Sequence, residues 1–290
     1  MILAIAHLIR PHHWIKNFFL FLPIFFAGGI FKNDKLWDTG MGFILFSFTA
    51  SAIYVLNDIK DVKTDRLHPT KKGRPIASGK VPIPLAYVLF AILLSGSVFG
   101  SYMLDHTFLY CIIAYLIINI AYTYGLKHVA ILDLFLVSSG FLLRVIGGGF
   151  ISEVPVSHWL IIMVLLLSLF LVLAKRRDDL ILALENPTLM RKSSSSYNLE
   201  FTNACLTMLS AVMIVAYIMY TVSDDVKMRL ESDYLFYTCI FVIAGVMRYL
   251  QITLVEKKSG SPTRILFSDG FIVVVIIGWM VSFYALIYII

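Results

Sequence analysis

Nine long apolar stretches constrain the fold of this 290-residue chain more than any other feature of its sequence. Each is long enough to cross a bilayer as an α-helix. A bilayer interior accepts only helices or closed barrels, because it offers no water to pair with backbone polar groups. The stretches cover residues 15–31, 39–56, 83–104, 107–124, 131–151, 158–175, 200–222, 234–255 and 265–289. The sequence therefore predicts an all-α, polytopic membrane protein with about nine transmembrane helices around a central cavity.

The composition supports this fold class. Hydrophobic residues make up 59% of the chain and charged residues 14%, which is typical of a multi-span membrane protein rather than a soluble domain. The net charge of +6 comes from the connecting loops, so we expect the lipid bilayer as a partner and no nucleic acid. The three cysteines lie inside apolar stretches without ligand or disulfide spacing, which predicts buried thiols.

The distribution of charge predicts the orientation. If the N-terminus is cytosolic, 18 of the 24 Lys and Arg residues fall in the inner segments, and the outer loops carry only Lys32, Lys35, Lys227 and Arg229. Cytoplasmic loops of membrane proteins carry such an excess of bases. We therefore expect a multi-pass protein of a bacterial-type inner (plasma) membrane, with its N-terminus in the cytosol and its C-terminus outside.

The chain shows no soluble domain. Its two largest inner connections, residues 57–82 and 175–199, each follow an even-numbered span and lie four spans apart. This spacing predicts one transmembrane domain over residues 1–290, built from two related halves of about 1–128 and 129–290 around one cavity.

An acidic motif follows the second apolar stretch. Asp58, Asp61 and Asp65 are spaced i, i+3, i+7, so a helix is expected to place their carboxylates on one narrow face, with Asn57 beside them. A divalent cation relieves the repulsion among them, and oxygen ligands favour Mg²⁺. The motif predicts a Mg²⁺ site at Asp58, Asp61 and Asp65. The alternative is a solvated helix end at the membrane surface.

The next segment, residues 66–80, concentrates bases, glycine and hydroxyl groups beside these acids. Acids for a metal next to bases for phosphate oxygens make up the pairing that a pyrophosphate site requires. Lys71 and Arg74 are therefore candidate phosphate ligands. The alternative is a loop that binds lipid headgroups.

The second inner connection begins with Lys175 and Arg176, which are candidates for clamping a phosphate. Asp178 or Asp179 is a candidate for contacting a metal or a sugar hydroxyl. Residues 191–197, with their serine run, are expected to form a mobile surface connection or a lid. The alternative for the whole group is stop-transfer charge.

Four further polar residues are candidates for the cavity. Tyr122 and Lys127 end the fourth span and Asp133 opens the fifth, although a single interfacial tyrosine is usually a membrane anchor. Arg144 lies well inside the fifth span, where an unpaired guanidinium is costly, so we expect it to face protein and to meet an acid or a phosphate. The segment 10–17, taken alone, indicates an interfacial anchor, and its two histidines lack the spacing of a zinc site.

The pattern Asn57-Asp58-x-x-Asp61-x-x-x-Asp65 on a nine-span chain resembles the UbiA superfamily of intramembrane prenyltransferases. More narrowly, the chain is similar to the decaprenyl-phosphate phosphoribosyltransferase branch. Four further stretches carry this resemblance: Arg10-Pro11-x-x-Trp14-x-Lys16-Asn17, Asp65-Arg66-x-His68-Pro69-x-Lys71-x-x-Arg74-Pro75-Ile76-Ala77-x-Gly79, Gly125-Leu126-Lys127 to Asp133 with Ser139-Gly140-Phe141-Leu142-x-Arg144, and Lys175-Arg176.

The resemblance implies a UbiA-like fold and a Mg²⁺-dependent transfer at the cytosolic face. A polyprenyl phosphate attacks the anomeric carbon of 5-phosphoribosyl 1-pyrophosphate and releases pyrophosphate. It also implies that Lys16 and Asn17 bind substrate. Typical members carry a second aspartate-rich motif after the sixth span, where this chain has Lys175-Arg176-Arg177-Asp178-Asp179, as the phosphoribosyltransferase branch does. That likeness favours Asp179 over Asp178.

Two other functions stay open at this stage. One is an ordinary UbiA-type prenyltransferase, which moves a prenyl group from its diphosphate to an aromatic or other acceptor. The other is a lipid transporter or lipid-binding protein without catalysis. The basic, phosphate-directed loops and the missing second aspartate motif favour the phosphoribosyltransferase, and isoprenoid length and oligomeric state are left open.

Overall fold

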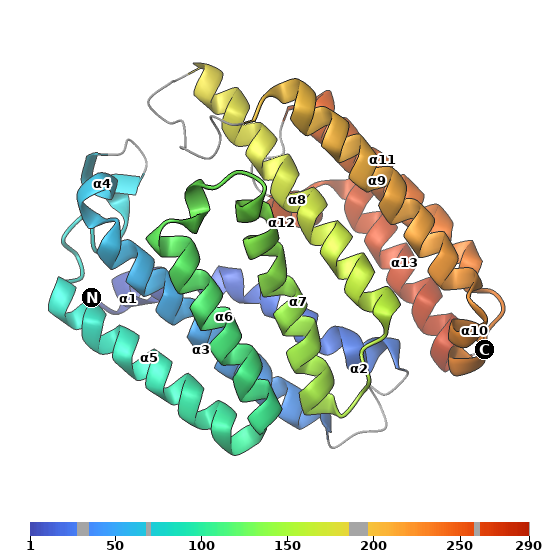
Figure 1. The fold of residues 1–290 in the computed structure, drawn as a ribbon, viewed down its shortest axis with the longest axis horizontal. Coiled ribbons are helices and arrows are strands. Elements are labelled where there is room, and N and C mark those ends of the chain that lie inside the picture. The colour runs from blue at the N-terminus through green and yellow to red at the C-terminus, as the bar shows by residue number, and fades with distance from the viewer. Residues whose placement is uncertain (28–34, 68–70, 186–196, 258–261, 290) are drawn as a thin grey trace. The chain divides into compact units, whose positions relative to one another are not determined.

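The computed structural model describes residues 1–27, 35–67, 71–185, 197–257 and 262–289, and the elements within these ranges are α-helices and short 3-10 helices (Figure 1). Among these residues, eight helical segments are long and apolar enough to cross a membrane. They are α3 (Lys35–Lys60), α5 (Ile83–Leu104), α6 (His106–Tyr124), α7 (Leu132–Ser152), α8 (His158–Glu185), α9 (Leu199–Val222), η6 (Leu235–Thr238) continued by α11 (Cys239–Leu254), and α13 (Gly270–Tyr288). The predicted all-α, multi-pass class is confirmed.

The first predicted span, residues 15–31, differs from a continuous membrane helix. After α1 (Ile2–Ile9), the chain forms the 3-10 helix η1 (Pro11–Phe21) and then the short α2 (Leu22–Phe26). Pro23 has no backbone N–H, and its ring hinders an α-helix that runs through this position, so the winding changes here. The end of the predicted span, from residue 28, lies outside the described residues.

Contacts divide the chain into two compact units, of which the first comprises residues 1–124 and 140–156. Its centre is α3, which packs against α5, α6 and η1 (Figure 1). Asn17 Nδ2 donates to Ser47 Oγ (2.8 Å) and Trp14 Nε1 to Ser51 Oγ (3.0 Å), and these bonds fix η1 along α3. The short elements α4 (Val62–Leu67) and η2 (Lys71–Gly73) follow α3. The polar residues at the end of α3 therefore stand on a well-packed helix.

The second unit comprises residues 125–139 and 157–290. It contains η3 (Leu126–His128), α8, α9, α11 and α13, together with the short α10 (Asp224–Leu230) and α12 (Pro262–Ser268). Its apolar core includes Phe170, Leu206 and Tyr249. The buried Arg177 donates to Asn203 Oδ1 (2.6 Å) and Thr253 O (2.6 Å), which ties α8 to α9 and α11.

Helix α7 contributes to both units, because residues up to 139 belong to the second and residues from 140 to the first. Each unit therefore combines two separate parts of the chain. It stays a prediction that residues 1–290 form one domain of two related halves, about 1–128 and 129–290.

Candidate active site

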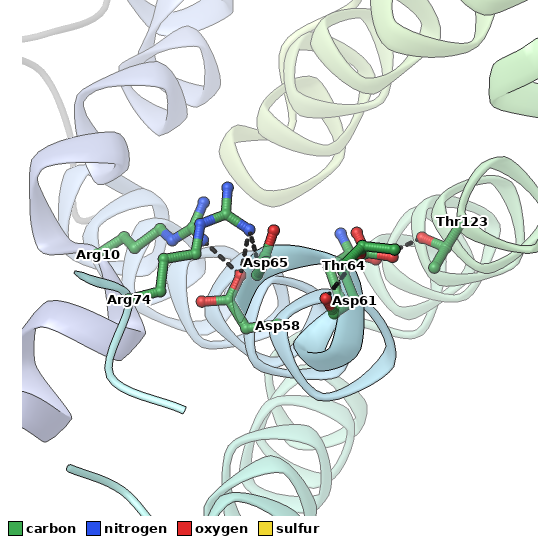
Figure 2. A network of polar contacts seen from close by, with 8 residues as sticks. Arg10, Asp58, Asp61, Thr64, Asp65, Arg74 and Thr123 are labelled. Atoms are coloured by element: carbon green, nitrogen blue, oxygen red, sulfur yellow. Dashed lines mark hydrogen bonds and ion pairs between the residues drawn. The ribbon is translucent and has the colours of Figure 1, made fainter. Parts of the chain in front are cut away.

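Asp58 lies near the end of α3 and is the centre of the polar network in the first unit. Its side chain is 2% exposed. Arg10 Nη2 donates to Asp58 Oδ1 at 2.6 Å, and Arg74 Nη1 donates to the same oxygen at 3.0 Å (Figure 2). Arg74 Nη1 also donates to Asp65 Oδ2 at 2.7 Å. Two buried carboxylates are thus held by two guanidinium groups that come from before and after α3 in the sequence.

Of the three aspartates whose spacing predicts one shared helix face, two are joined by the same arginine. Asp58 and Asp65 meet at Arg74, whereas Asp61 lies apart from them, near Thr64 (Figure 2). The helical winding that the spacing assumes is present, because Asp61 N donates to Asn57 O (2.9 Å) and Asp65 N to Asp61 O (2.8 Å) from α3 into α4. At about 100° per residue, Asp65 returns to within about 20° of Asp58, while Asp61 is displaced by about 60°.

The way in which the negative charge of the aspartates is offset also differs from the prediction. A cation is predicted to relieve the repulsion among the acids, but Arg10 and Arg74 already pair with Asp58 across 48 and 16 residues of sequence. Within the described residues, no group of three or more His, Cys, Asp or Glu side chains is placed to hold a metal ion. A cage of three carboxylates is therefore not the arrangement found.

One carboxylate oxygen still suits a metal. Asp58 Oδ2 is buried and has no hydrogen-bond partner among the described residues. Mg²⁺ typically takes one or two protein carboxylates and completes its shell with water and substrate phosphates. The residues present therefore fit a substrate-assisted Mg²⁺ site with Asp58 as a ligand, and the assignment of Asp61 and Asp65 as further ligands stays a prediction.

Asn57 and its neighbours connect the acidic motif to the end of α6. Thr123 Oγ1 donates to Asn57 Oδ1 at 2.6 Å (Figure 2), and Lys60 Nζ donates to Thr123 O at 2.7 Å. The Lys60 ammonium also lies 3.7 Å from the centre of the Tyr124 ring. The predicted Tyr122 is half-buried at the same helix end. These contacts fix the position of Asn57 and, through α3, of Asp58.

A cleft of about 870 Å³ opens beside Asp58 within the first unit. Its other lining residues come from α1 and the residues that flank it, from the start of η1, and from the end of η2 with the segment after it: Met1, Leu3, Ala4, His7, Arg10, His12, His13, Gly73, Arg74, Pro75 and Lys80. Arg74, a predicted phosphate ligand, lines this cleft, and the predicted Lys71 is half-buried in η2 beside it in sequence. The volume is within the range of small-molecule sites.

Arg144 faces protein, as expected, but the partners recorded for it are neutral. Its Nε donates to Asn17 Oδ1 (2.7 Å) and its Nη1 to Gly140 O (2.6 Å), and the guanidinium lies 4.5 Å from the centre of the Phe46 ring. The expected acid is thus replaced, among the described residues, by an amide, a carbonyl and aromatic rings. Lys16, on η1 next to Asn17, is partly buried.

The second unit holds another group of predicted residues around Asp133. Asp133 is fully buried, and its Oδ2 accepts from Arg176 Nε at 2.8 Å, while Arg176 Nη1 donates to Asp179 Oδ2 at 3.2 Å. The Tyr197 hydroxyl donates to Asp133 Oδ1 at 2.9 Å. Both oxygens of Asp133 are therefore engaged, which makes it a residue that orients Arg176.

Tyr197 completes this group at a strained turn. It accepts a hydrogen bond of 2.5 Å from Ile131 N, and Ile131 has a φ of 67°. A β-branched residue in the left-handed region is a true outlier, so the hydroxyl holds a conformation that the chain does not favour by itself. Burial raises the pKa of the Tyr197 phenol to about 12. The prediction that residues 191–197 form a mobile connection is wrong for Tyr197, while residues 191–196 lie outside the described residues.

The two predicted lysines of this unit are more accessible. Lys127 is half-buried in η3, and Lys175 is exposed on α8, directly before the buried Arg176. The buried Arg176, in contrast, is held by two acids. The roles of Lys127, Lys175, Arg176 and Asp179 in substrate binding stay predictions.

Sequence reasoning missed Arg10 and Tyr197 as site residues. Arg10 was interpreted as an interfacial anchor, although its place in the Arg10-Pro11 motif was a usable signal. Tyr197 gave no local signal, because its partners Ile131 and Asp133 stand more than 60 residues earlier.

Comparison with known proteins places these observations in a family context. Residues 17–187 match the model described as the UbiA prenyltransferase family. A protein of Mycobacterium tuberculosis named decaprenyl-phosphate phosphoribosyltransferase is 32% identical over 286 residues, which cover 97% of this chain and 93% of that protein. One of the same name from Corynebacterium glutamicum is 30% identical over 285 residues, covering 97% and 86%.

Solved structures agree on the fold. A UbiA homolog from Archaeoglobus fulgidus, bound to DMAPP and Mg²⁺, superposes with a TM-score of 0.73 at 19% identity and covers 99% of this chain and 100% of that chain. A UbiA homolog from Aeropyrum pernix K1 superposes with a TM-score of 0.69 at 15% identity, covering 93% and 99%. The helices described above therefore adopt the fold of these proteins.

Proposed function

The chain belongs to the UbiA prenyltransferase family, and from this premise we propose that it transfers a 5-phosphoribosyl group from 5-phosphoribosyl 1-pyrophosphate to a polyprenyl phosphate, with release of pyrophosphate. The observation that carries the proposal is the near full-length similarity, at 30–33% identity, to several proteins named decaprenyl-phosphate phosphoribosyltransferase. The arginines beside Asp58 support it, because they suit phosphate groups.

The reaction asks for positioning rather than for a protein nucleophile. An oxygen of the lipid phosphate forms a bond to the anomeric carbon of the ribose, and the bond from that carbon to pyrophosphate breaks. Negative charge moves from the acceptor phosphate to the departing pyrophosphate, and no proton has to be transferred. Catalysis then consists of holding the two anions close together and stabilising the leaving group.

The residues of the first unit supply this positioning. Arg10 and Arg74 bind phosphate oxygens, and Asp58 and Asp65 hold the two guanidiniums in place. Asp58, with Asp61 and Asp65, would bind Mg²⁺, which when present neutralises charge on the pyrophosphate. On sequence grounds, substrate binding is assigned to further residues of this unit: Lys16, Asn17, Asn57, Lys71, Tyr122 and Arg144.

The predicted site residues of the second unit fall into an accessible group and a more buried group. Lys127 and Lys175 are assigned to phosphate groups of the donor, since they are accessible. Asp133 is assigned to orienting Arg176, and Asp179 is the better candidate for contacting the ribose because its side chain is 27% exposed. We place these groups at the cytosolic face of the plasma membrane, where a soluble sugar phosphate meets a lipid acceptor, with the N-terminus in the cytosol.

A protection experiment tests the proposed donor. Ligand that binds only the folded protein raises its resistance to heat. We expect 5-phosphoribosyl 1-pyrophosphate to raise the melting temperature of the detergent-purified protein when Mg²⁺ is present, and much less with EDTA. Protection by prenyl diphosphates, with none by the ribose donor, would instead identify an ordinary prenyltransferase.

A further inference from the structure

Thr123, in the last turn of α6, is a buried polar residue outside the set of predicted site residues. It is 3% exposed. Its Oγ1 lies 2.6 Å from Asn57 Oδ1 on α3 and 2.7 Å from Asn119 O, one turn earlier in its own helix (Figure 2). A buried hydroxyl that reaches the amide next to Asp58 is a candidate for orienting that amide.

The backbone of Thr123 is also held by α3. Lys60 Nζ donates to Thr123 O at 2.7 Å, and the same ammonium lies 3.7 Å from the centre of the Tyr124 ring. A lysine at the last carbonyls of a helix pairs with oxygens that have no partner inside that helix. Asn57 and Lys60 are about one turn apart on α3, so α3 contacts the end of α6 at two points. The Thr123 hydroxyl therefore has a fixed position relative to Asn57.

A single proton decides how the Asn57 amide is turned. A threonine hydroxyl donates one hydrogen bond, and two carbonyl oxygens lie within its reach. Asn119 O belongs to the backbone ladder of α6, whereas Asn57 Oδ1 has no other recorded partner in the described part of the chain. If the proton went to Asn119 O, two oxygens would face each other at 2.6 Å without a hydrogen between them. The proton therefore belongs to the bond with Asn57.

The length of this contact agrees with that assignment. O–H···O bonds are about 2.5–3.0 Å long, and N–H···O bonds are about 2.7–3.2 Å long. At 2.6 Å, the contact lies within the first range and outside the second. The amide oxygen of Asn57 thus faces Thr123, and its NH₂ group is the end that points away from Thr123.

The two ends of an amide have opposite chemistry. The NH₂ group donates hydrogen bonds and does not bind a metal ion, whereas the oxygen accepts hydrogen bonds or binds a cation. Asn57 is half-buried and stands directly before Asp58, the residue whose Oδ2 suits Mg²⁺. The orientation of the amide therefore decides whether Asn57 adds a ligand to that metal or a donor beside it.

From these observations we propose that Thr123 is a positioning residue for the transfer reaction. Its hydroxyl holds the Asn57 amide oxygen, so that Asn57 meets the substrates as a hydrogen-bond donor and not as a metal ligand. The inference rests on the proposed function and adds to it a residue that touches neither substrate, because the Thr123 hydroxyl is buried and already engaged.

Steady-state phosphoribosyl transfer by the full-length protein in detergent tests this role. Thr123→Val keeps the shape of the side chain and removes the proton, whereas Thr123→Ser keeps the proton. Thr207→Val, on α9, is the matched control, because the exposed Thr207 hydroxyl donates to Asn203 O (3.0 Å), one turn earlier, and has no recorded side-chain partner among the described residues. We expect Thr123→Val to lower kcat/KM about tenfold, the change that a misplaced substrate-binding group produces. Thr123→Ser and Thr207→Val should stay within about twofold of the unmodified protein.

Two measurements separate this role from a purely structural one. Because Thr123 acts through Asn57, Thr123→Val should add less than about twofold to the loss of transfer that Asn57→Ala causes by itself. The second measurement does not use turnover. It is the Mg²⁺ concentration that gives half of the heat protection by saturating 5-phosphoribosyl 1-pyrophosphate, and Asn57→Ala should leave it within about threefold, since the amide is no metal ligand.

Three results would overturn the proposal: independent, multiplying losses in the double variant, a Thr123→Ser protein as impaired as Thr123→Val, or a rise of about tenfold or more in the half-protecting Mg²⁺ concentration of Asn57→Ala, the loss expected when a metal site is disturbed. Should Thr123→Val fail to fold, the Mg²⁺ titration still decides, because it needs only Asn57→Ala. Failure of the proposed function would look different. In that case the unmodified protein forms no phosphoribosyl product, and the coupling of Thr123 to Asn57 is measured with a prenyl diphosphate as substrate.

Discussion

Asp58 shows how a single residue sets the charge balance of the candidate site. A buried carboxylate is costly unless it is paired, and here it is paired with two arginines at one oxygen while the other oxygen has no partner among the described residues. Removing the charge leaves Arg10 without its recorded acid, leaves Arg74 paired with Asp65 alone, and removes the proposed metal ligand. The same residue therefore serves the fold and the chemistry.

We expect Asp58→Asn to reduce phosphoribosyl transfer by at least about 100-fold, because it disturbs both phosphate-binding arginines and Mg²⁺ binding. Size-exclusion profiles in detergent should stay normal, since the amide is isosteric. Asp38→Asn, on the exposed first turn of the same helix, is the control. Near-normal turnover of Asp58→Asn would move the active site elsewhere.

Adjacent residues on α8 should behave differently. Arg176 is 3% exposed and is held by Asp133, so Arg176→Ala leaves a buried acid without its cation and should destabilise the protein by about 3–5 kcal/mol. Lys175→Ala should change stability by less than about 0.5 kcal/mol. It should weaken donor affinity by about 10- to 100-fold, the loss expected for a charge-assisted contact.

Chemical denaturation in detergent measures the stability of the two variants. Titration with 5-phosphoribosyl 1-pyrophosphate measures the donor affinity of Lys175→Ala. If Lys175→Ala binds the donor normally and loses only the lipid, the two substrates are assigned the wrong way round. An Arg176→Ala protein of unchanged stability would contradict the structural role of the Asp133 pair.

For single residues, the sequence predicts which types of side chain lie close together, but not which of their atoms form hydrogen bonds. The proximity of acids and bases in residues 57–80 was sufficient to predict that Arg74 lies near Asp58. The pairing with Arg10 depends on how η1 packs along α3, which is a tertiary property.

At the scale of elements, Tyr197 joins the start of α9 to the segment before α7. Tyr197→Phe leaves Ile131 N and Asp133 Oδ1 without a partner, which should cost about 1–3 kcal/mol of stability. The melting temperature in detergent measures this, with Tyr237→Phe, at a 62% exposed position, as the control. Equal melting temperatures for the two variants would show that the hydroxyl does not hold the turn.

The pH dependence of this contact has a defined sign. Because the pKa of Tyr197 is raised from 10.0 to about 12 in the folded protein, its contribution is fully present below pH 10 and is lost as the pH rises through 12. The stability difference between the unmodified protein and Tyr197→Phe should therefore narrow over this interval, as followed by thermal melts from pH 9 to 12. A difference that widens with pH would contradict the assignment.

The approach of α7 to η1 depends on a glycine. A Cβ at Gly148 would lie 2.0 Å from Leu20 O, so Gly148→Ala must push the two elements apart and should cost about 1–3 kcal/mol. A Cβ at Gly96, inside α5, would meet no described atom within 4 Å beyond the backbone of its own helix, so Gly96→Ala should be neutral or stabilising by up to about 1 kcal/mol. Equal melting temperatures for the two variants would contradict this packing.

For the whole molecule, the length and apolarity of the segments were sufficient to predict a multi-pass helical protein, because a bilayer allows few alternatives. They were not sufficient for the first stretch, where Pro23 and the bonds of Asn17 and Trp14 favour a different winding. Nor did they indicate that α7 contributes to both compact units, since that follows from the proximity of segments far apart in sequence.

The central claim is that this membrane protein moves a phosphoribosyl group onto a lipid phosphate. The most direct measurement is an incubation of the purified protein with Mg²⁺, 5-phosphoribosyl 1-pyrophosphate labelled in the ribose, and decaprenyl phosphate. We predict that label passes into the lipid fraction with release of one pyrophosphate per transfer, and that Asp58→Asn abolishes the transfer. A lipid fraction without label, from protein that instead transfers prenyl groups from a prenyl diphosphate to an aromatic acceptor, would contradict the account.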